Sequence, residues 1–359
     1  MAVALVNARV LGDDGLVDGR CVLLEGARIL DVVAESDPRC QTAERRDLGG
    51  RLLLPGFIDS QVNGGGGVLF NDAPSVAAIR AIGAAHRRFG TTGFLPTLIS
   101  DDLDTIGRGI AAVQASLDAG MPGVLGIHIE GPFLNWARRG VHDSKHLRLL
   151  DTSLVSLLSR LRGGRTVVTL APEMTTPDMV AQLAAGGVLV SAGHSEASYA
   201  ETTAAIAHGL RGFTHLFNAM ARLEPREPGI VGAALYDENT WCGIIVDGHH
   251  VDPVMLKLAL RCKRHDRFML VTDAMPIVGS ADFSVPSSSS VLSLLPSFTK
   301  ITSLGIKSFC RTIDNRRLNS RMTSSSLYAG TTMDTSLTGL VTAGPDSTNH
   351  RRARGTHGG

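Results

Sequence analysis

The fold is indicated most clearly by one ten-residue stretch, Gly126-Ile-His-Ile-Glu-Gly-Pro-Phe-Leu-Asn135. The apolar run from Gly123 to Ile129 predicts a short, buried parallel strand, because turn formers bound it. This strand ends on Glu130, and an ionised carboxylate at the end of a buried strand is costly unless a metal, a cation or hydrogen-bond donors compensate it. Taken alone, Glu130 is best explained as a strand end whose side chain turns out to solvent. Its function therefore depends on which residues the fold brings near it.

Strands alternate with helices on both sides of this stretch. Strands are expected at residues 52–59, 91–99, 123–130, 166–171, 188–192, 212–216, 241–246 and 268–273, with helical spacing between most of them. Eight strand-then-helix units of this length favour an α/β fold of the (β/α)8 TIM-like barrel type over a doubly wound sheet.

The ends of the chain differ from this pattern. Residues 2–50 consist of short strands separated by turns, without a helical period. The predicted organisation is a small β-sandwich domain built from residues 1–50, a barrel from 51–283, a divergent C-terminal region from 284–344 and a disordered tail from 345–359. The C-terminal half of the small domain is expected to be missing or divergent.

Composition excludes several classes of protein. A net charge of +1 and a pI near 7.8 argue against a nucleic-acid-binding protein, which usually carries a basic stripe. The five cysteines are odd in number and form no CxxC pair, which argues against a disulfide framework and a thiolate zinc site. Met1 to Val6 is too short for a signal peptide, and no apolar stretch has the length of a membrane helix. The expected location is the cytoplasm.

Several of the predicted strands end on a residue that binds metals or moves protons. The functional groups of such barrels lie at the C-terminal ends of the strands. Here these ends carry Glu130, His194, His215, the segment Asp247-Gly-His-His250, and Asp273. Each has a simpler explanation alone: a strand-end histidine is usually hydrogen-bonded, and an aspartate usually caps a helix or forms a turn. Five such coincidences at one end of one barrel are improbable, so the sequence predicts a shared site.

Glu130, His194 and His215 form a two-histidine, one-carboxylate set. Such a set suits a catalytic zinc or iron ion that keeps one position open for water. A metal lowers the pKa of its bound water from about 16 to roughly 7. Asp273, at the last strand, is then placed to take a proton from the water and return it to a leaving group. The implied reaction class is hydrolysis of an unreactive bond such as an amide.

Five motifs together resemble a known family. They are Leu54-Pro-Gly-Phe-Ile-Asp-Ser-Gln-Val-Asn-Gly64, His128-Ile-Glu-Gly-Pro-Phe-Leu-Asn135, Ala192-Gly-His-Ser195, Thr214-His-Leu-Phe-Asn-Ala-Met220 and Val271-Thr-Asp-Ala-Met275. In this order they resemble the N-acetylglucosamine-6-phosphate deacetylases, a branch of the amidohydrolase superfamily, over residues 1 to about 283.

The resemblance implies an activity and a role for particular residues. The expected reaction is deacetylation of N-acetylglucosamine 6-phosphate by a homodimer. Glu130, His194 and His215 match the metal ligands and Asp273 the catalytic base and acid. The residues that match substrate-binding positions are His142, Asn218, Ala219, Arg226 and His250. A guanidinium suits a phosphate chemically, although Arg226 could equally be a solvated loop charge.

The chain departs from the family pattern at two places. Amidohydrolases often carry His-x-His after the first strand, where this chain has Gln61-Val-Asn63. Amides are poor metal ligands, so one divalent ion is expected, zinc first and Fe²⁺ or another ion as alternatives. Gln61 and Asn63 would then contact the ligands or the water. Residues 285–321 do not resemble the family, which leaves two alternatives open: an amidohydrolase for another N-acyl compound, or a catalytically impaired relative.

Overall fold

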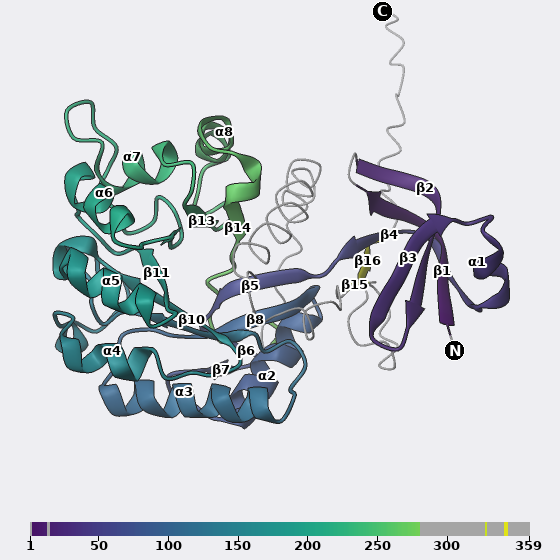
Figure 1. The fold of residues 1–359 in the computed structure, drawn as a ribbon, viewed down its shortest axis with the longest axis horizontal. Coiled ribbons are helices and arrows are strands. Elements are labelled where there is room, and N and C mark those ends of the chain that lie inside the picture. The colour runs from purple at the N-terminus through teal and green to yellow at the C-terminus, as the bar shows by residue number, and fades with distance from the viewer. Residues whose placement is uncertain (1, 13–14, 281–326, 329–340, 344–359) are drawn as a thin grey trace, which may run out of the picture. The chain divides into compact units, whose positions relative to one another are not determined.

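The computed structural model describes residues 2–12, 15–280, 327–328 and 341–343 (Figure 1). The chain divides between Pro55 and Gly56 into two compact units. The first unit contains the N-terminal strands and the short described segments near the C-terminus, and the second contains residues 56–280 of the described chain. The expected boundary at residue 50 lies within strand β4, and most of the predicted segments 284–344 and 345–359 lie outside the described residues.

The N-terminal unit is a sheet with the strand order β15-β4-β1-β2-β3. Its strands are β1 (Ala2–Gly12), β2 (Gly15–Glu25), β3 (Arg28–Ala34), β4 (Glu44–Pro55), β15 (Leu327–Tyr328) and β16 (Val341–Ala343). Alternate residues of β1 are buried on opposite faces, with Leu5 and Val10 in one apolar cluster and Ala4 and Val6 in another. β15 and β16 both pair antiparallel with β4. The sequence does not predict these two strands, because segments so short show no alternation.

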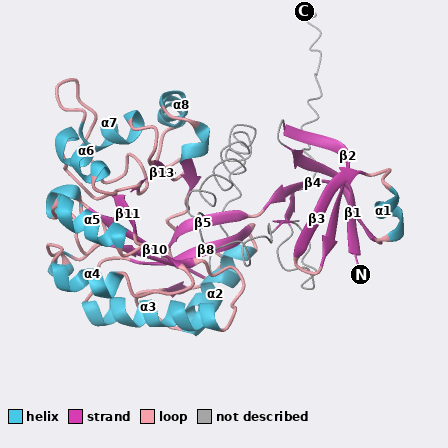
Figure 2. Ribbon diagram, in the orientation of Figure 1, coloured by secondary structure: helices cyan, strands magenta, loops and turns pink. Residues whose placement is uncertain are grey.

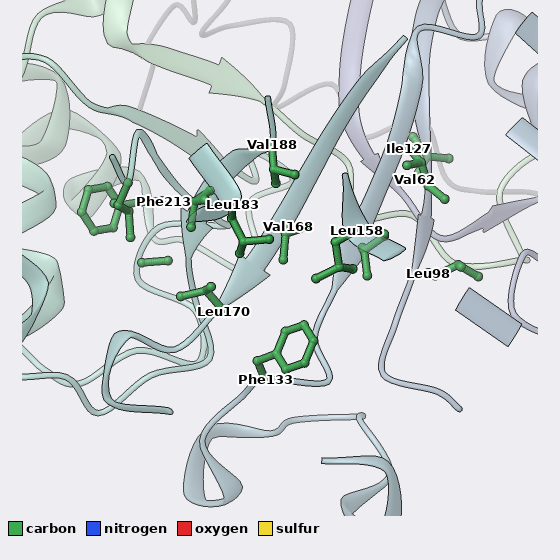
Figure 3. Packing of buried hydrophobic residues seen from close by; sticks show 14 of the residues in the cluster. Val62, Leu98, Ile127, Phe133, Leu158, Val168, Leu170, Leu183, Val188 and Phe213 are labelled. Carbon is green, nitrogen blue, oxygen red and sulfur yellow. The ribbon is translucent and has the colours of Figure 1, made fainter. Parts of the chain in front are cut away.

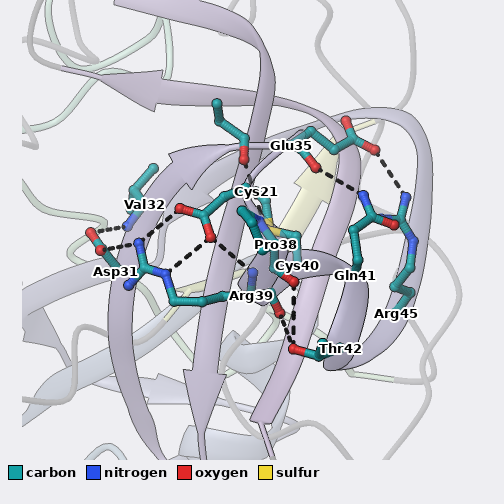
Figure 4. Close-up of a disulfide and its surroundings, with 12 residues drawn as sticks. Cys21, Asp31, Val32, Glu35, Pro38, Arg39, Cys40, Gln41, Thr42 and Arg45 are labelled. Atoms are coloured by element: carbon teal, nitrogen blue, oxygen red, sulfur yellow. Dashed lines mark hydrogen bonds and ion pairs between the residues drawn. A yellow bond between two sulfur atoms is a disulfide. The ribbon is translucent and has the colours of Figure 1, made fainter.

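A disulfide joins Cys21 and Cys40 in this unit (Figure 4). Cys21 lies on β2, and Cys40 lies on helix α1 (Pro38–Thr42), which begins after the N-cap Asp37. Both cysteines are fully buried, so the bond attaches α1 to the sheet. The expectation that the cysteines form no disulfide is therefore wrong for this pair. Their separation of 19 residues matches no motif, and the fold alone brings them together.

The second unit is a barrel, which confirms the predicted fold class. Eight strands form one sheet: β5 (Phe57–Val62), β8 (Thr91–Leu98), β9 (Gly126–Glu130), β10 (Arg165–Leu170), β11 (Leu189–Ala192), β12 (Gly212–Phe213), β13 (Trp241–Ile244) and β14 (Phe268–Leu270). All neighbouring strands run parallel. The segment after β14 returns to β5, where Ala274 bridges to Val62 and the N–H of Asp273 donates to the carbonyl of Gln61 at 3.0 Å. This contact closes the sheet into a ring.

Helices connect the barrel strands and lie outside them (Figure 2). They are α2 (Val76–Arg87), α3 (Leu103–Asp118), α4 (Thr152–Leu158), α5 (Pro177–Ala185), α6 (Tyr199–Ala207), α7 (Gly229–Tyr236) and α8 (Pro253–Cys262). Six of them begin after a serine, threonine or aspartate whose side chain accepts a backbone N–H of the first turn. None of the helices in the described part of the chain is long and apolar enough to cross a membrane.

One continuous apolar core fills the space between strands and helices (Figure 3). Strand residues such as Val168 and Phe213 meet helix residues such as Leu158 and Leu183 there. Both faces of the short strands are therefore buried, which explains why their sequences are apolar runs rather than alternating patterns.

The glycines after β5 form a tight hairpin. Strands β6 (Gly64–Gly65) and β7 (Val68–Leu69) pair antiparallel. Gly66 and Gly67, which connect them, have φ values of +63° and +83°. A two-residue turn of this kind requires positive φ at both positions, which glycine adopts without strain.

Candidate active site

Three buried side chains meet at the C-terminal ends of the barrel strands. Glu130 is the last residue of β9, His194 follows β11 and His215 follows β12. The Oε1 atom of Glu130 lies 3.3 Å from His194 Nε2 and 3.0 Å from His215 Nε2, and the two nitrogens are 2.9 Å apart. Together they form a group of ligand atoms that could hold a metal ion. The structure thus brings together the three residues that the sequence predicts as metal ligands.

The chemistry of these three atoms fits a cation. The Nδ1–H of His194 donates to the carbonyl of Arg138 at 2.7 Å, so in the neutral ring Nε2 carries a lone pair. His215 makes its side-chain contacts through Nε2 alone, since its Nδ1 is buried without a partner among the described residues. His194 Nε2 and Glu130 Oε1 therefore face each other as acceptors, and His215 Nε2 lies within hydrogen-bond distance of both. Such a set repels itself unless a proton or a metal ion lies between its members.

The same proximity shifts the pKa values of the group. Burial alone would raise the pKa of Glu130, but His194 and His215 outweigh it and hold that pKa well below its usual value. Burial alone would lower the pKa of His215, but the charge and hydrogen bond of Glu130 raise it. The carboxylate is therefore ionised and ready to ligate a cation at neutral pH.

Four of the predicted functional residues have a left-handed backbone, among them Ala219 with a φ of +51°. The φ values of His194, His215 and Asp273 are +50°, +34° and +51°. Such values are uncommon for residues other than glycine and cost free energy unless the surroundings enforce them. His194, His215 and Asp273 each lie two or three residues after the end of a barrel strand, so these turns place their side chains at the C-terminal ends of the strands.

Asp273 is connected to the ligand group through Gln61. Asp273 Oδ1 accepts hydrogen bonds from Asn63 Nδ2 at 2.6 Å and from Gln61 Nε2 at 3.1 Å. Gln61 Nε2 also lies 2.9 Å from Glu130 Oε1. Burial, and then the charge of Glu130, raise the pKa of Asp273. Gln61 and Asn63 contact carboxylates, the kind of role that the sequence predicts for them.

His142 lies beside the group with its proton position set by a neighbour. Its Nδ1 accepts the backbone N–H of Ser100 at 3.1 Å, so the neutral ring carries its proton on Nε2. This nitrogen lies 3.9 Å from Glu130 Oε2, and the ring centroid is 4.5 Å from that of His194. Burial lowers the pKa of His142 to about 4, so the ring is neutral at pH 7. His142 thus presents an N–H donor to the site.

The other residues predicted to bind substrate are placed less closely. Asn218 and Ala219 follow His215 on one segment, where Asn218 Nδ2 donates to the carbonyl of His215 at 3.3 Å. Arg226 is exposed and has no hydrogen bond or ion pair within the described part of the chain. His250 is exposed and donates from Nδ1 to Asp247 Oδ2 at 2.6 Å. No contact between described residues joins Arg226 or His250 to the metal-binding group.

Three further residues lie around the site, and no role for them was predicted from the sequence. His128 donates from Nδ1 to the carbonyl of Ser60 at 3.0 Å and accepts the hydroxyl of Thr169 at 2.7 Å. Burial lowers the pKa of His128 to about 4. Asp59 accepts the hydroxyl of Thr272 at 2.6 Å, and burial raises the pKa of Asp59 to about 7.

The third of these residues is Glu173, which follows β10. Glu173 could have been identified from the sequence, because functional groups of such barrels lie at the C-terminal ends of strands and Ala171-Pro-Glu173 stands at the end of a predicted strand. The alternation of side chains could have identified His128 and Asp59, which precede Glu130 and Gln61 by two residues and so face the same side.

Comparisons with known proteins agree with this architecture. The model of the amidohydrolase family matches residues 52–294. The chain is 48% identical to an N-acetylgalactosamine-6-phosphate deacetylase of Shewanella sp. (strain ANA-3), over 64% of this chain and 58% of that protein. It is 36% identical to an N-acetylglucosamine-6-phosphate deacetylase of Bos taurus, over 77% of this chain and 70% of that protein. It therefore spans less than two thirds of the length of the Shewanella relative.

A solved structure gives the same result. The crystal structure of N-acetylglucosamine-6-phosphate deacetylase from Pasteurella multocida matches with a TM-score of 0.74 and 33% sequence identity. The match covers 78% of this chain and 73% of that one.

Proposed function

The chain belongs to the amidohydrolase family, and on this basis we propose that it hydrolyses the acetamide of N-acetylglucosamine 6-phosphate to glucosamine 6-phosphate and acetate. One observation carries the proposal: Glu130 Oε1, His194 Nε2 and His215 Nε2 converge, and Gln61 connects Glu130 to Asp273. A divalent ion, when bound by these three ligands, supplies an activated water and polarises the acetamide carbonyl.

Asp273 is the proposed proton carrier. Its Oδ1 accepts two amide hydrogen bonds, whereas its Oδ2 has no hydrogen bond within the described structure. Oδ2 is therefore the atom left to take a proton from the attacking water and to deliver it to the departing amine nitrogen. The oxygen of the water adds to the acetamide carbon, and the carbon–nitrogen bond then breaks as the nitrogen is protonated, which gives acetate and the free amine. His142 Nε2–H donates to the acetamide oxygen, where negative charge develops.

The proposed metal content is one ion per chain. Gln61 and Asn63 occupy the position where other amidohydrolases carry His-x-His, so this chain has no imidazole there to bind a second ion. Their amide N–H groups instead donate to the carboxylates of Glu130 and Asp273. Zinc is the proposed ion, with Fe²⁺ as the alternative that the same ligands suit. Elemental analysis that finds two ions per chain would contradict this part of the proposal.

The phosphate is the proposed anchor of the substrate. Arg226 is an exposed guanidinium without a partner among the described residues, and we assign the phosphate to Arg226 and His250 and the sugar to Asn218 and Ala219. Arg226→Ala should raise KM for the phosphorylated substrate and leave turnover of unphosphorylated N-acetylglucosamine unchanged. An equal effect on both substrates would remove Arg226 from this role. The cytoplasmic location expected from the sequence and a homodimer complete the proposal, and the homodimer rests on the resemblance to the deacetylase family alone.

The epimer N-acetylgalactosamine 6-phosphate is a second candidate substrate. It is favoured by the 48% identity to the Shewanella relative, whose name specifies that sugar. The two sugars differ only in the orientation of one hydroxyl. A comparison of kcat/KM for the two sugar phosphates decides between them, and an N-acetylated amino acid in the same assay tests for a different substrate class. We expect acetate release from a sugar phosphate. Release from the amino acid alone would favour an amidohydrolase for other N-acyl compounds, and release from no substrate would favour a catalytically impaired relative.

A further inference from the structure

We propose that Glu173 is a positioning residue that sets the orientation of His194 for metal binding. Glu173 lies in the 3-10 turn Pro172–Met174 directly after β10, between the strands that precede Glu130 and His194. Its carboxylate accepts three hydrogen bonds, from Asn135, Ser195 and Glu196. These donors belong to the loops that follow β9 and β11. The inference rests on the proposed metal site and names a residue that supports it without touching the ion.

The first connection runs along the backbone next to His194. The hydroxyl of Ser195 donates to Glu173 Oε2 at 2.7 Å, and the N–H of Glu196 donates to Glu173 Oε1 at 2.6 Å. The hydroxyl of Ser195 also accepts the N–H of Ala197 at 2.9 Å. The two residues that follow His194 are therefore held by one carboxylate. This matters because His194 has a φ of +50°, a conformation that its surroundings must enforce.

The second connection runs to the ring of His194. Asn135 Nδ2 donates to Glu173 Oε1 at 3.0 Å, and the backbone N–H of Asn135 donates to the carbonyl of His194 at 3.0 Å. Asn135 Oδ1 caps the 3-10 helix η1 (Trp136–Arg138) by accepting the N–H of Ala137 at 2.8 Å. The carbonyl of Arg138, at the end of this short helix, accepts the Nδ1–H of His194 at 2.7 Å.

The two connections close a ring around His194. Glu173 holds the backbone after the histidine and, through Asn135 and η1, the carbonyl that orients its imidazole. An ion pair between Arg138 and Glu196 joins the same two loops. Partners behind a metal-ligating histidine fix its tautomer and ring orientation, and their loss typically costs about 10- to 100-fold in metal affinity. We expect that effect when the carboxylate of Glu173 is removed.

The test compares Zn²⁺ affinity with the stability of the metal-free protein. Glu173→Ala removes all three acceptor contacts and should weaken Zn²⁺ binding about 10- to 100-fold in a competition titration with a chromophoric chelator. Glu173→Gln keeps one oxygen for the donors from Asn135 and Glu196, so it should restore affinity to within about threefold of the wild type.

Glu201→Ala is the matched control. Glu201 also accepts a backbone N–H and a serine hydroxyl, both from Ser198, but this capping box belongs to α6 and not to the loops around His194. The control should lower the midpoint of thermal unfolding and leave Zn²⁺ affinity unchanged. If Glu173→Ala does not fold, Asn135→Asp is the substitute variant. It places a carboxylate against that of Glu173 without loss of volume and keeps the oxygen that caps η1. It should weaken Zn²⁺ binding in the same way.

The possible results separate the inference from the proposed function. If the wild type binds Zn²⁺ and Glu173→Ala binds it equally well while its thermal midpoint falls, Glu173 is only structural and the inference is wrong. An affinity loss in Glu201→Ala as large as in Glu173→Ala would also overturn it. A wild type that binds neither Zn²⁺ nor Fe²⁺ would instead refute the proposed function itself.

Discussion

Replacing Asp273 by asparagine removes the proposed proton carrier with little change in shape. In the wild type Asp273 Oδ1 accepts hydrogen bonds from Asn63 and Gln61. The side-chain oxygen of an asparagine can accept the same two bonds. What the variant loses is the oxygen Oδ2, which can take a proton in the aspartate but becomes an amide nitrogen.

The size of the expected effect follows from these contacts. General acid–base catalysis contributes about 10²- to 10⁴-fold, which corresponds to about 3–5 kcal/mol of activation free energy. Asp273 takes up and returns the proton, so we expect kcat to fall toward the upper end of this range. Stability should change by no more than about 2 kcal/mol. The variant loses some stability because two charge-assisted hydrogen bonds become neutral ones. It regains some because the side chain is no longer a buried charge near Glu130, and this burial and charge are what raise the pKa of Asp273 in the wild type.

The assay measures acetate release, metal content and thermal unfolding on one preparation of Asp273→Asn. Asp252→Asn serves as the control, because Asp252 caps α8 and asparagine is an equally good N-cap. We expect Asp273→Asn to keep its metal and to lose nearly all turnover, and the control to be fully active. Residual turnover above about a tenth of the wild-type rate, with metal retained, would refute the assignment of Asp273 as the base.

Three further predictions concern other parts of the site and the fold. His142→Ala should lower kcat about 10²-fold and leave the metal content unchanged, because it deletes the N–H donor that Ser100 orients; unchanged kinetics would contradict this role. The pKa of His128 is about 4 in the fold against 6.5 for the free side chain, so the neutral ring stabilises the fold fully above pH 6.5 and less as the pH falls toward 4. In urea unfolding measured in EDTA, this group should therefore lower the free energy of unfolding by about 2 kcal/mol as the pH falls from 7.5 to 5. The variant His128→Asn should lack that part of the pH dependence. Cys40→Ser opens the 19-residue segment closed by the disulfide and should cost about 3 kcal/mol in denaturant unfolding, whereas a reductant that destabilises the variant as much as the wild type would argue against the bond.

The barrel could be predicted from sequence because its physical signals are local. A parallel strand buried on both faces is a short apolar run, and six of the seven helices between such runs begin after their own capping side chain. Glu130, His194, His215 and Asp273 could be predicted for a related reason. They directly follow such runs, and the ends of parallel barrel strands meet in space.

The supporting residues could not be predicted in the same way, because their roles depend on distant partners. Glu173 contacts Asn135 and Ser195, which are 38 and 22 residues away in the chain. The pairing of Cys21 with Cys40 depends on where α1 lies on the sheet. Arg226 is named only by its resemblance to a family position, and its role in binding phosphate stays a prediction.

The most direct test of this account is a titration of metal-free protein with Zn²⁺, with acetate release from N-acetylglucosamine 6-phosphate measured at each point. We predict that activity rises with added metal and saturates at one equivalent per chain, and that Glu130→Gln shows neither binding nor activity, because it removes the carboxylate that both histidines face. Acetate release that is independent of metal, or full activity in Glu130→Gln, would contradict the claim that these three side chains hold the catalytic ion.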